Sequence, residues 1–410
     1  MKKMNRWVYA IIGVIVLVFA GLVYAWSVIS KPIEATFAGE WTKAQLSMTF
    51  TLTMAMFCIG CLLGGILAKK VKARYYVLVS GVLFFAGFML ASGTQSLPTL
   101  YLGFGVMAGL ASGLAYNAVM STMSAWFPDK QGLISGILLM GFGIGSFIIG
   151  KVYAAYTPSD GGDGWRASFK VFAIILLVVM VVCSFFFVRP GEDFKPPVAE
   201  NKKVVREPAL DIPTGQMVRK VPFWLYYIWA ILLSAAGLAL VSQANGIAEQ
   251  VGPHVSAGNL ATVVGLISIM NGVGRVFFGG LFDKKGYRFT MILDMIVFII
   301  ASGILILALK SGNFAFIVLG FIVGGFAYSG VTPTNSAIIS DFFGRTNYPM
   351  NFSLINTNLI IASFASTIAG KLYDASQSYM STIFMMLGVT IVGFIVFIGI
   401  RRPKPAAESK

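Results

Sequence analysis

One arginine inside an apolar stretch is the residue of this sequence best suited to hold an anion. Arg275 lies in "NGVGRVFFGGLFDKKGYR", which runs from Asn271 to Arg288, and the nearest acidic residue along the chain is Asp283. A guanidinium is a planar set of donors that can bind a carboxylate through two parallel hydrogen bonds. Asn271 lies one helical turn earlier on the same face, and because its amide is neutral it can orient the arginine or bind a ligand without cancelling the charge.

The next charged residue along the chain gives the depth of Arg275 in the membrane. Asp283 lies eight positions after Arg275, so a helix places the arginine about 12 Å inside the apolar segment. In a bilayer core of about 30 Å this is close to the middle. An arginine there costs about 2.5–3.5 kcal/mol, so we expect it to face an interior cavity. Two interpretations stay open: an anion-binding site, or a structural ion pair with Asp294, the best-embedded carboxylate.

The elements that position this arginine are membrane-spanning helices. Of the 410 residues, 57% are hydrophobic and 11% are charged, whereas a soluble domain has about 25% charged residues. Since about 20 apolar residues cross a bilayer as a helix, the sequence predicts an all-α membrane protein with twelve transmembrane helices. Their predicted ranges are 7–30, 44–68, 75–94, 98–126, 130–156, 167–188, 222–249, 258–282, 289–309, 314–340, 348–372 and 379–400.

The helices divide into two pseudo-symmetric bundles of six. Residues 189–221 form a polar, proline-containing stretch that we interpret as a cytoplasmic linker between an N-terminal bundle, 1–188, and a C-terminal bundle, 222–410. The halves also resemble each other, since "GLASGLAYNAV" (109–119) is similar to "VGGFAYSGV" (323–331). Two repeated six-helix halves are typical of secondary transporters.

The net charge of +15 is explained by orientation across the membrane. Most lysines and arginines fall in alternate loops on the side of the N-terminus, which predicts that this side is cytoplasmic and that both termini lie there. Nucleic acid is therefore not an expected partner, whereas anionic lipid headgroups are. The basic residues expected on the outer side are Lys31, Lys43, Lys151, Arg166, Lys170, Lys310 and Lys371.

Few residues are available for catalysis or metal binding. The chain has one histidine and three cysteines. The pair Cys58 and Cys61 lies in an apolar helix with no second pair, so we interpret both as small packing residues. We expect no enzyme activity, no catalytic residue, no metal and no cofactor.

The cytoplasmic end of the Arg275 helix carries a recognisable loop. "GGLFDKKGYR" (279–288) resembles the pattern G-x-L-x-D-R/K-x-G-x-R of the major facilitator superfamily. Asp283 can cap a helix end or pair with a basic residue across a helix interface, while Lys284 and Arg288 hold the loop on the cytoplasmic side. The matching loop of the first half, "GGILAKKVKARYY" (64–76), lacks the acid.

Further motifs resemble the oxalate:formate antiporter family, a branch of the major facilitators related to monocarboxylate transporters. They are "NRW" (5–7), "VYAW" (23–26), "WFPDKQGLISG" (126–136), "NGVGR" (271–275) and "NYPMNF" (347–352). The resemblance implies that Arg275 binds the substrate carboxylate and that aromatic residues line the pocket. The complete predicted binding set is Arg275, Asn271, Tyr24, Trp26, Tyr116, Asn117, Tyr328 and Asn356, and the predicted gating or structural set is Asp283, Lys284, Arg288 and Asp294.

One departure from the family pattern bears on the substrate. The oxalate carrier that the chain resembles has a lysine on helix 11, but the matching place here is at or beside Ile355, and no lysine or arginine occurs between Arg345 and Lys371. A dianion facing one fixed positive charge would be under-compensated. The sequence therefore favours a monocarboxylate such as lactate, pyruvate or formate over oxalate.

The predicted function is secondary transport of small carboxylates across the inner or plasma membrane by alternating access. Oxalate:formate exchange is the alternative within the same fold. A membrane sensor and a membrane enzyme are less compatible with the short tails and with the lack of a catalytic cluster. Proton symport and anion exchange stay open, and we expect a monomer.

Overall fold

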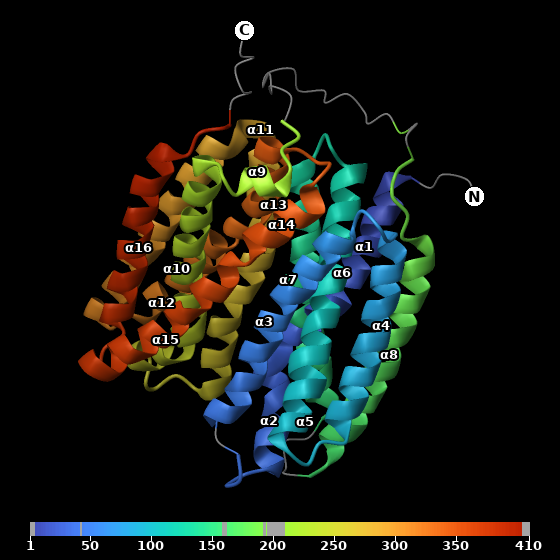
Figure 1. Ribbon diagram of the computed structural model, residues 1–410. Coiled ribbons are helices and arrows are strands. Elements are labelled where there is room, and N and C mark those ends of the chain that lie inside the picture. The colour runs from blue at the N-terminus through green and yellow to red at the C-terminus, as the bar shows by residue number, and fades with distance from the viewer. Residues whose placement is uncertain (1–4, 42, 158–161, 192–193, 195–209, 404–410) are drawn as a thin grey trace. The chain divides into compact units, whose positions relative to one another are not determined.

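The computed structural model describes residues 5–41, 43–157, 162–191, 194 and 210–403, and these residues form helices without β-strands (Figure 1). Their contacts divide the chain into two compact units: Met1–Pro128 with Gly141–Pro197, and Asp129–Met140 with Val198–Lys410. The predicted linker, 189–221, lies largely outside the described residues. The twelve residues from Asp129 to Met140, which begin the predicted fifth helix, group with the second unit.

In the first unit, α6 contacts α1, α3 and α4, and α4 also contacts α8. The first predicted helix is interrupted by a short 3-10 segment, η1, and the predicted fourth helix contains a π-helical stretch, η2. The elements are α1 (Arg6–Ala20), η1 (Gly21–Ala25), α2 (Trp26–Thr36), α3 (Lys43–Leu67), α4 (Ala73–Ser92), α5 (Leu97–Leu100), η2 (Tyr101–Ala108), α6 (Gly109–Trp126), the part of α7 (Gln131–Tyr156) from Gly141 onward, and α8 (Gly164–Phe186).

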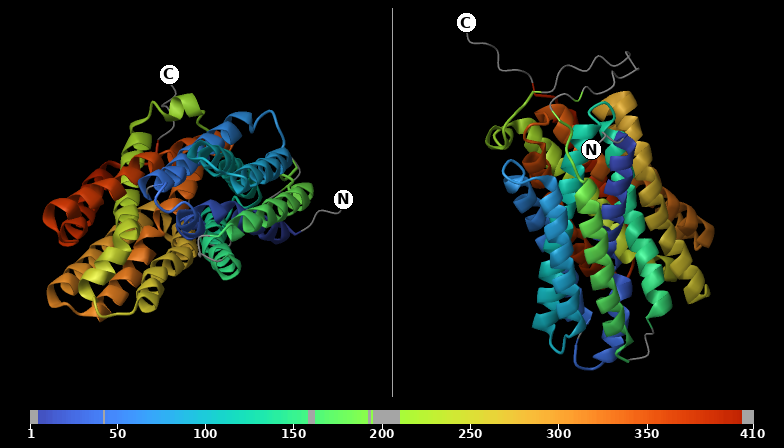
Figure 2. Two further views of the ribbon diagram at one scale, coloured as in Figure 1. Left: turned by 90° about the horizontal axis from the view of Figure 1, so that it is seen from below. Right: turned by 90° about the vertical axis from the view of Figure 1, so that its right-hand side faces the viewer.

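In the second unit, α10 contacts α11, α12, α15 and α16, and the end-on view on the left of Figure 2 lets the reader follow these helices. Two of the predicted helices are each divided into a consecutive pair, α12 with α13 and α14 with α15. The elements are α9 (Thr214–Met217), α10 (Val221–Val251), α11 (Ala257–Ser311), α12 (Phe314–Tyr328), α13 (Val331–Phe343), α14 (Tyr348–Asn356), α15 (Asn358–Ser376) and α16 (Met380–Gly399).

The longest element, α11, contains two membrane crossings. Its 55 residues would extend about 80 Å as one straight helix, far beyond a bilayer core of about 30 Å. Gly286 breaks the helix with φ 78° and ψ 177°, a conformation that is favourable only for glycine. The described residues contain 11 helices long and apolar enough to span a membrane. With the break at Gly286, these provide the twelve predicted crossings, and the predicted fold class is confirmed.

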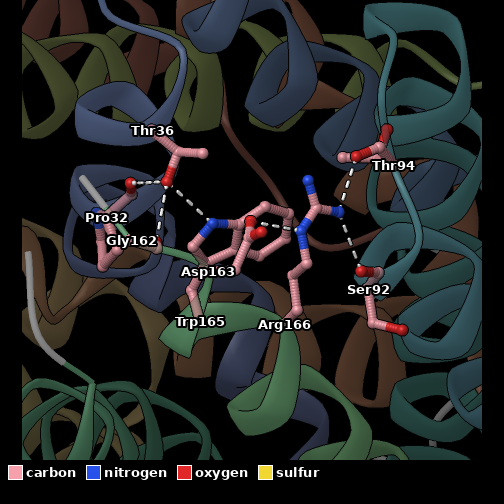
Figure 3. A network of polar contacts seen from close by, with 8 residues as sticks. All are labelled: Pro32, Thr36, Ser92, Thr94, Gly162, Asp163, Trp165 and Arg166. Carbon is pink, nitrogen blue, oxygen red and sulfur yellow. Dashed lines mark hydrogen bonds and ion pairs between the residues drawn. The ribbon is translucent and has the colours of Figure 1, made fainter.

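At one end of the first unit, Arg166 links the start of α8 to the end of α4 (Figure 3). Its Nε donates to the Asp163 carboxylate at 2.6 Å. Its Nη1 donates to the backbone carbonyls of Ser92 at 3.0 Å and Thr94 at 2.6 Å. A guanidinium thus satisfies carbonyls that the end of α4 leaves without helical partners.

A second set of bonds in Figure 3 fastens α2 to the same region. The Trp165 indole N–H donates to the Thr36 hydroxyl at 3.0 Å. The hydrogen of that hydroxyl lies within reach of two backbone carbonyls, Pro32 at 2.9 Å and Gly162 at 3.1 Å. The ends of α2, α4 and α8 are therefore held together by side chains that bond to backbone groups.

At the second unit, Asp211 fastens the chain before α9 to the loop between α13 and α14. One carboxylate oxygen accepts from the backbone N–H groups of Arg345 at 3.0 Å and Thr346 at 3.1 Å, and the other accepts from the Thr346 hydroxyl at 2.6 Å. The Ile212 N–H donates to the Phe343 carbonyl at 3.0 Å. We call this arrangement, residues 210–212 against 343–346, the Asp211 clasp.

The Asp211 clasp depends on a glycine. Gly344 has φ +79°, and a Cβ there would overlap the Asp211 carboxylate, so the turn requires a residue without a side chain. Partial burial raises the pKa of Asp211, but the hydrogen bonds from the Thr346 hydroxyl and the backbone of Thr346 and Arg345 outweigh it and hold the pKa below its usual value.

Arg166→Ala should destabilise the first unit, because it leaves the carbonyls of Ser92 and Thr94 without their charged donor. Hydrogen bonds to charged groups contribute about 1.5–3 kcal/mol each, so we expect a clear loss of thermal stability in detergent. Lys170→Ala is the matched control, since Lys170 is an exposed cation on the same helix. Equal melting temperatures for the two variants would contradict this role of Arg166.

Asp211→Asn should weaken the Asp211 clasp in a pH-dependent way. Because the folded-state pKa is depressed, the stabilisation is complete above the unfolded value of about 3.9 and is lost as the pH falls through the folded pKa. At pH 7 we expect the variant to melt about 2 °C lower, from about 1 kcal/mol of lost hydrogen bonding. The difference should shrink towards pH 3, and a difference that is constant with pH would contradict the assignment.

Candidate functional site

Arg275 lies half-buried on α11, with its guanidinium held from two sides. Its Nε donates to the Asn271 side-chain oxygen at 2.8 Å, and its Nη1 donates to the Leu139 backbone carbonyl at 2.6 Å. Asn271 is itself 8% exposed. Both of these contacts are to neutral oxygens, which orient the guanidinium without themselves neutralising it.

The carbonyl of Leu139 reaches Arg275 because glycines allow α7 and α11 to cross in backbone contact. A Cβ on Gly136 would overlap the backbone carbonyl of Arg275, and a Cβ on Gly132 would overlap that of Gly279. Small residues four apart are a known device for close helix approach in membranes. The spacing of Gly132 and Gly136 was the sequence signal for this crossing, and sequence reasoning missed it.

Asp283 caps the start of α7. Its two carboxylate oxygens accept from the backbone N–H groups of Gly132 at 2.9 Å and Leu133 at 2.7 Å. A carboxylate at a helix N-terminus satisfies donors that have no helical partner and interacts favourably with the helix dipole. The basic residues that follow Asp283 are more exposed than it is. Lys284 is exposed, and the exposed Arg288 donates to the Tyr287 hydroxyl at 3.1 Å.

Two predicted binding residues of the second unit lie where the helical hydrogen bonding tightens. Tyr328 ends α12 and lies within electrostatic range of Arg275. The next two residues, Ser329 and Gly330, keep helical dihedral angles, and their N–H groups donate to carbonyls three residues earlier. The Tyr328 ring lies so close to Gly237 of α10 that a Cβ there would overlap it. Asn356, which is 2% exposed, ends α14 beside Thr357, which has the same helical angles and three-residue bond.

In the first unit, Tyr24 and Tyr116 are both packed against Phe142. Each tyrosine ring has its centroid 5.3 Å from that of Phe142, and Tyr116 also contacts Phe57 at 5.1 Å. Tyr24 lies in the 3-10 segment η1 and is 37% exposed, whereas Tyr116 is buried. Phe142 thus joins the two predicted aromatic positions, and its place in the uninterrupted apolar run of α7 gave sequence reasoning no signal.

Trp26 and Asn117 are held in contacts between helices of the same unit. The buried Trp26 donates its indole N–H to the Leu46 carbonyl at 3.2 Å, and its ring lies 4.6 Å from that of Phe104. Asn117 is 1% exposed, and its side chain lies against Gly64 of α3. These contacts position helices around the aromatic cluster. A direct role of either residue in substrate binding stays a prediction, as does the union of the residues of both units into one site.

Asp294 does not form the ion pair considered from the sequence. It is 1% exposed, and neither of its carboxylate oxygens has a hydrogen-bond partner among the described residues. The contacts of Arg275 run to Asn271 and Leu139 instead. The structural interpretation of Arg275 as a partner of Asp294 is therefore wrong.

Comparisons with known proteins point to transport. The chain is 27% identical to the oxalate:formate antiporter of Oxalobacter formigenes, over 84% of this chain and 80% of that protein. It is 23% identical to monocarboxylate transporter 12 of Mus musculus, over 92% of this chain and 81% of that protein. The resemblance drawn from the sequence motifs is confirmed, and the relatives are transporters rather than enzymes.

Structural similarity and the family model agree with this fold. A bacterial homologue of the iron transporter ferroportin, crystallised in an outward-facing state, superposes with a TM-score of 0.70 at 16% identity, over 96% of this chain and 99% of that chain. At that identity the likeness concerns the fold alone. The model of the Major Facilitator Superfamily matches residues 13–311 and 238–410. Together with the helices described above, this match shows that the chain is a multi-pass membrane transporter belonging to the Major Facilitator Superfamily.

Proposed function

We propose that this transporter carries small monocarboxylates of the lactate, pyruvate or formate class, with the substrate carboxylate held by Arg275. The observation that carries the proposal is the setting of Arg275: a half-buried guanidinium in a membrane-spanning helix, oriented by neutral oxygens of Asn271 and Leu139. A cation in such a setting attracts an anion strongly, because little water screens the interaction.

The charge balance supports a monoanion. In the helix pair α14–α15, residues 348–370 contain no lysine or arginine, and Ile355, at or beside the place where the resembled oxalate carrier has its lysine, is fully buried. The polar residue beside it is the neutral Asn356. One fixed positive charge matches one carboxylate, whereas a second carboxylate would lose its hydration without compensation.

The tyrosines supply the remaining recognition in this proposal. Tyr328, at the end of α12, and Tyr24 and Tyr116, around Phe142, each combine a hydroxyl donor with an apolar ring. Such side chains suit a ligand with a charged end and a short apolar end. Transport proceeds by alternating access in the inner or plasma membrane, with both termini in the cytoplasm, as the distribution of basic residues indicates.

Arg275→Ala should abolish saturable uptake of labelled lactate, pyruvate and formate into proteoliposomes. Loss of a buried charged partner costs about 2–5 kcal/mol, so we expect uptake to fall by at least about 30-fold. Arg275→Lys should recover only part of the activity, since an ammonium keeps the charge but not the paired donors.

The matched control is Lys310→Ala, which removes an exposed cation from the other end of the same helix, α11. This variant should transport like the wild type. Saturable uptake by Arg275→Ala with an unchanged KM, in protein that is inserted to the same level, would contradict the proposed role of Arg275.

Oxalate:formate exchange is the second candidate, favoured by the similarity to the antiporter of Oxalobacter formigenes. The two candidates differ in how well a dianion competes with a monoanion. If Arg275 is the one fixed positive charge that faces the substrate, inhibition of labelled lactate uptake should require at least about tenfold more oxalate than unlabelled lactate. This factor corresponds to about 1.4 kcal/mol of uncompensated charge. Equal inhibition by the two anions, together with formate-dependent release of internal oxalate, would favour the exchanger.

A further inference from the structure

A carboxyl group without a partner lies deep in the second unit. Asp294 is 1% exposed and lies on the second crossing of α11, eight residues after the break at Gly286, which is about 12 Å along the helix. Its carboxyl group lies against Gly330, where a Cβ would overlap it. Gly330 connects α12 with α13 within one membrane-spanning stretch, Phe314–Phe343, and Ser329 and Gly330 keep helical dihedral angles. A buried acid thus lies against the glycine that connects the two helices.

Among the described residues, no surrounding group neutralises this carboxyl group. Besides α7, which crosses the Arg275 part of α11, the helices that contact α11 most extensively are α10, α12, α13 and α16. On α10, Tyr226 is the titratable neighbour of Asp294, but its hydroxyl donates to the Asn335 side-chain oxygen at 2.7 Å. The other titratable groups on these helices are Tyr227 and Glu249 on α10, Tyr328 at the end of α12, and Asp341 on α13, which pairs with Arg402; α16 carries none.

The protonation state follows from this setting. An ionised carboxylate that is buried in an apolar layer with no partner is strongly unfavourable, whereas the protonated acid is neutral. The nearby Asn335 also has a side-chain nitrogen without a hydrogen-bond partner. Buried polar groups are rarely left in this state. Tyr226, the neighbour of Asp294, donates to Asn335, so both groups adjoin the same buried tyrosine.

We propose that Asp294 is the proton-binding site of this transporter, loaded as the neutral acid while Gly330 and its neighbours enclose it. This inference rests on the proposed carboxylate transport and identifies the coupling ion. A shift of α12 and α13 against α11 opens the niche to water, the acid releases its proton as the carboxylate forms, and the reverse step takes a proton from water. Tyr328 lies two residues before Gly330, so substrate binding near Tyr328 and protonation of Asp294 depend on each other.

The first test uses wild-type protein in proteoliposomes containing a pH-sensitive dye. External lactate should drive proton entry, and an outside-acid gradient of about one pH unit should raise lactate accumulation about tenfold at one proton per anion. Asp294→Asn mimics the neutral acid in shape. It should lose both the proton signal and the gradient-driven accumulation while keeping exchange of external for internal lactate. Glu249→Gln, which removes an exposed acid from α10, should behave like the wild type.

A second measurement does not depend on a variant that folds. Dicyclohexylcarbodiimide reacts with protonated carboxyl groups in apolar surroundings, so the wild-type protein should be labelled at Asp294, as read by mass spectrometry of the peptide that contains it. Labelling should fall as the pH is raised, and saturating lactate should change its rate. The absence of labelling at every pH would overturn the proposal.

Other outcomes separate this inference from the proposed function. Lactate uptake by the wild type that is indifferent to the pH gradient and moves no protons would overturn the role of Asp294 and leave carboxylate transport standing. Unchanged gradient-driven accumulation by Asp294→Asn would overturn it as well. So would accumulation driven by a sodium gradient in place of the proton gradient. A well-inserted Asp294→Asn variant that loses both lactate exchange and gradient-driven accumulation would show a structural role for the residue. That outcome would also overturn the proposal.

Discussion

The cost of placing charge in an apolar layer governs most of this structure. Only 11% of the residues are charged, and the charged side chains that do enter the spans have defined settings. Arg275 is turned toward the neutral oxygens of Asn271 and Leu139. Asp283 is bound to the first N–H groups of α7. Asp294 has no such compensation, which is the physical reason to assign it a proton.

The positions of these charged side chains depend on close backbone contact between helices. Gly132 and Gly136 bring α7 so near to α11 that the Leu139 carbonyl bonds to Arg275 and the start of α7 bonds to Asp283. Gly330 does the same for the carboxyl group of Asp294. In each case the absence of a side chain admits a polar group that a methyl group would exclude, so glycine composition and polar chemistry are linked in this fold.

Three residues predicted to recognise substrate lie where the helical hydrogen bonding changes. Tyr24 lies in a 3-10 segment, Tyr328 ends α12 and Asn356 ends α14. Ser329 and Gly330, which follow Tyr328, keep helical dihedral angles and donate to carbonyls three residues earlier, which is a local tightening of the helix. Tyr328 precedes these residues and the carboxyl group of Asp294 lies against Gly330, so recognition by Tyr328 and the state of Asp294 are connected through the same short segment.

The sequence by itself determined the number of crossings and the superfamily, since these depend on hydrophobic length and on loop motifs. The depth of Arg275 stays a prediction from the fixed rise of a helix. The sequence also indicated that Asn271 would orient the arginine, because residues four apart on a helix are neighbours. Only the tertiary structure decided between partners that are distant in sequence. It assigned Leu139 to Arg275, Gly132 and Leu133 to Asp283, Phe142 to both tyrosines, and no partner to Asp294. Such choices depend on which helix faces cross and how closely, and local periodicity contains no information about that.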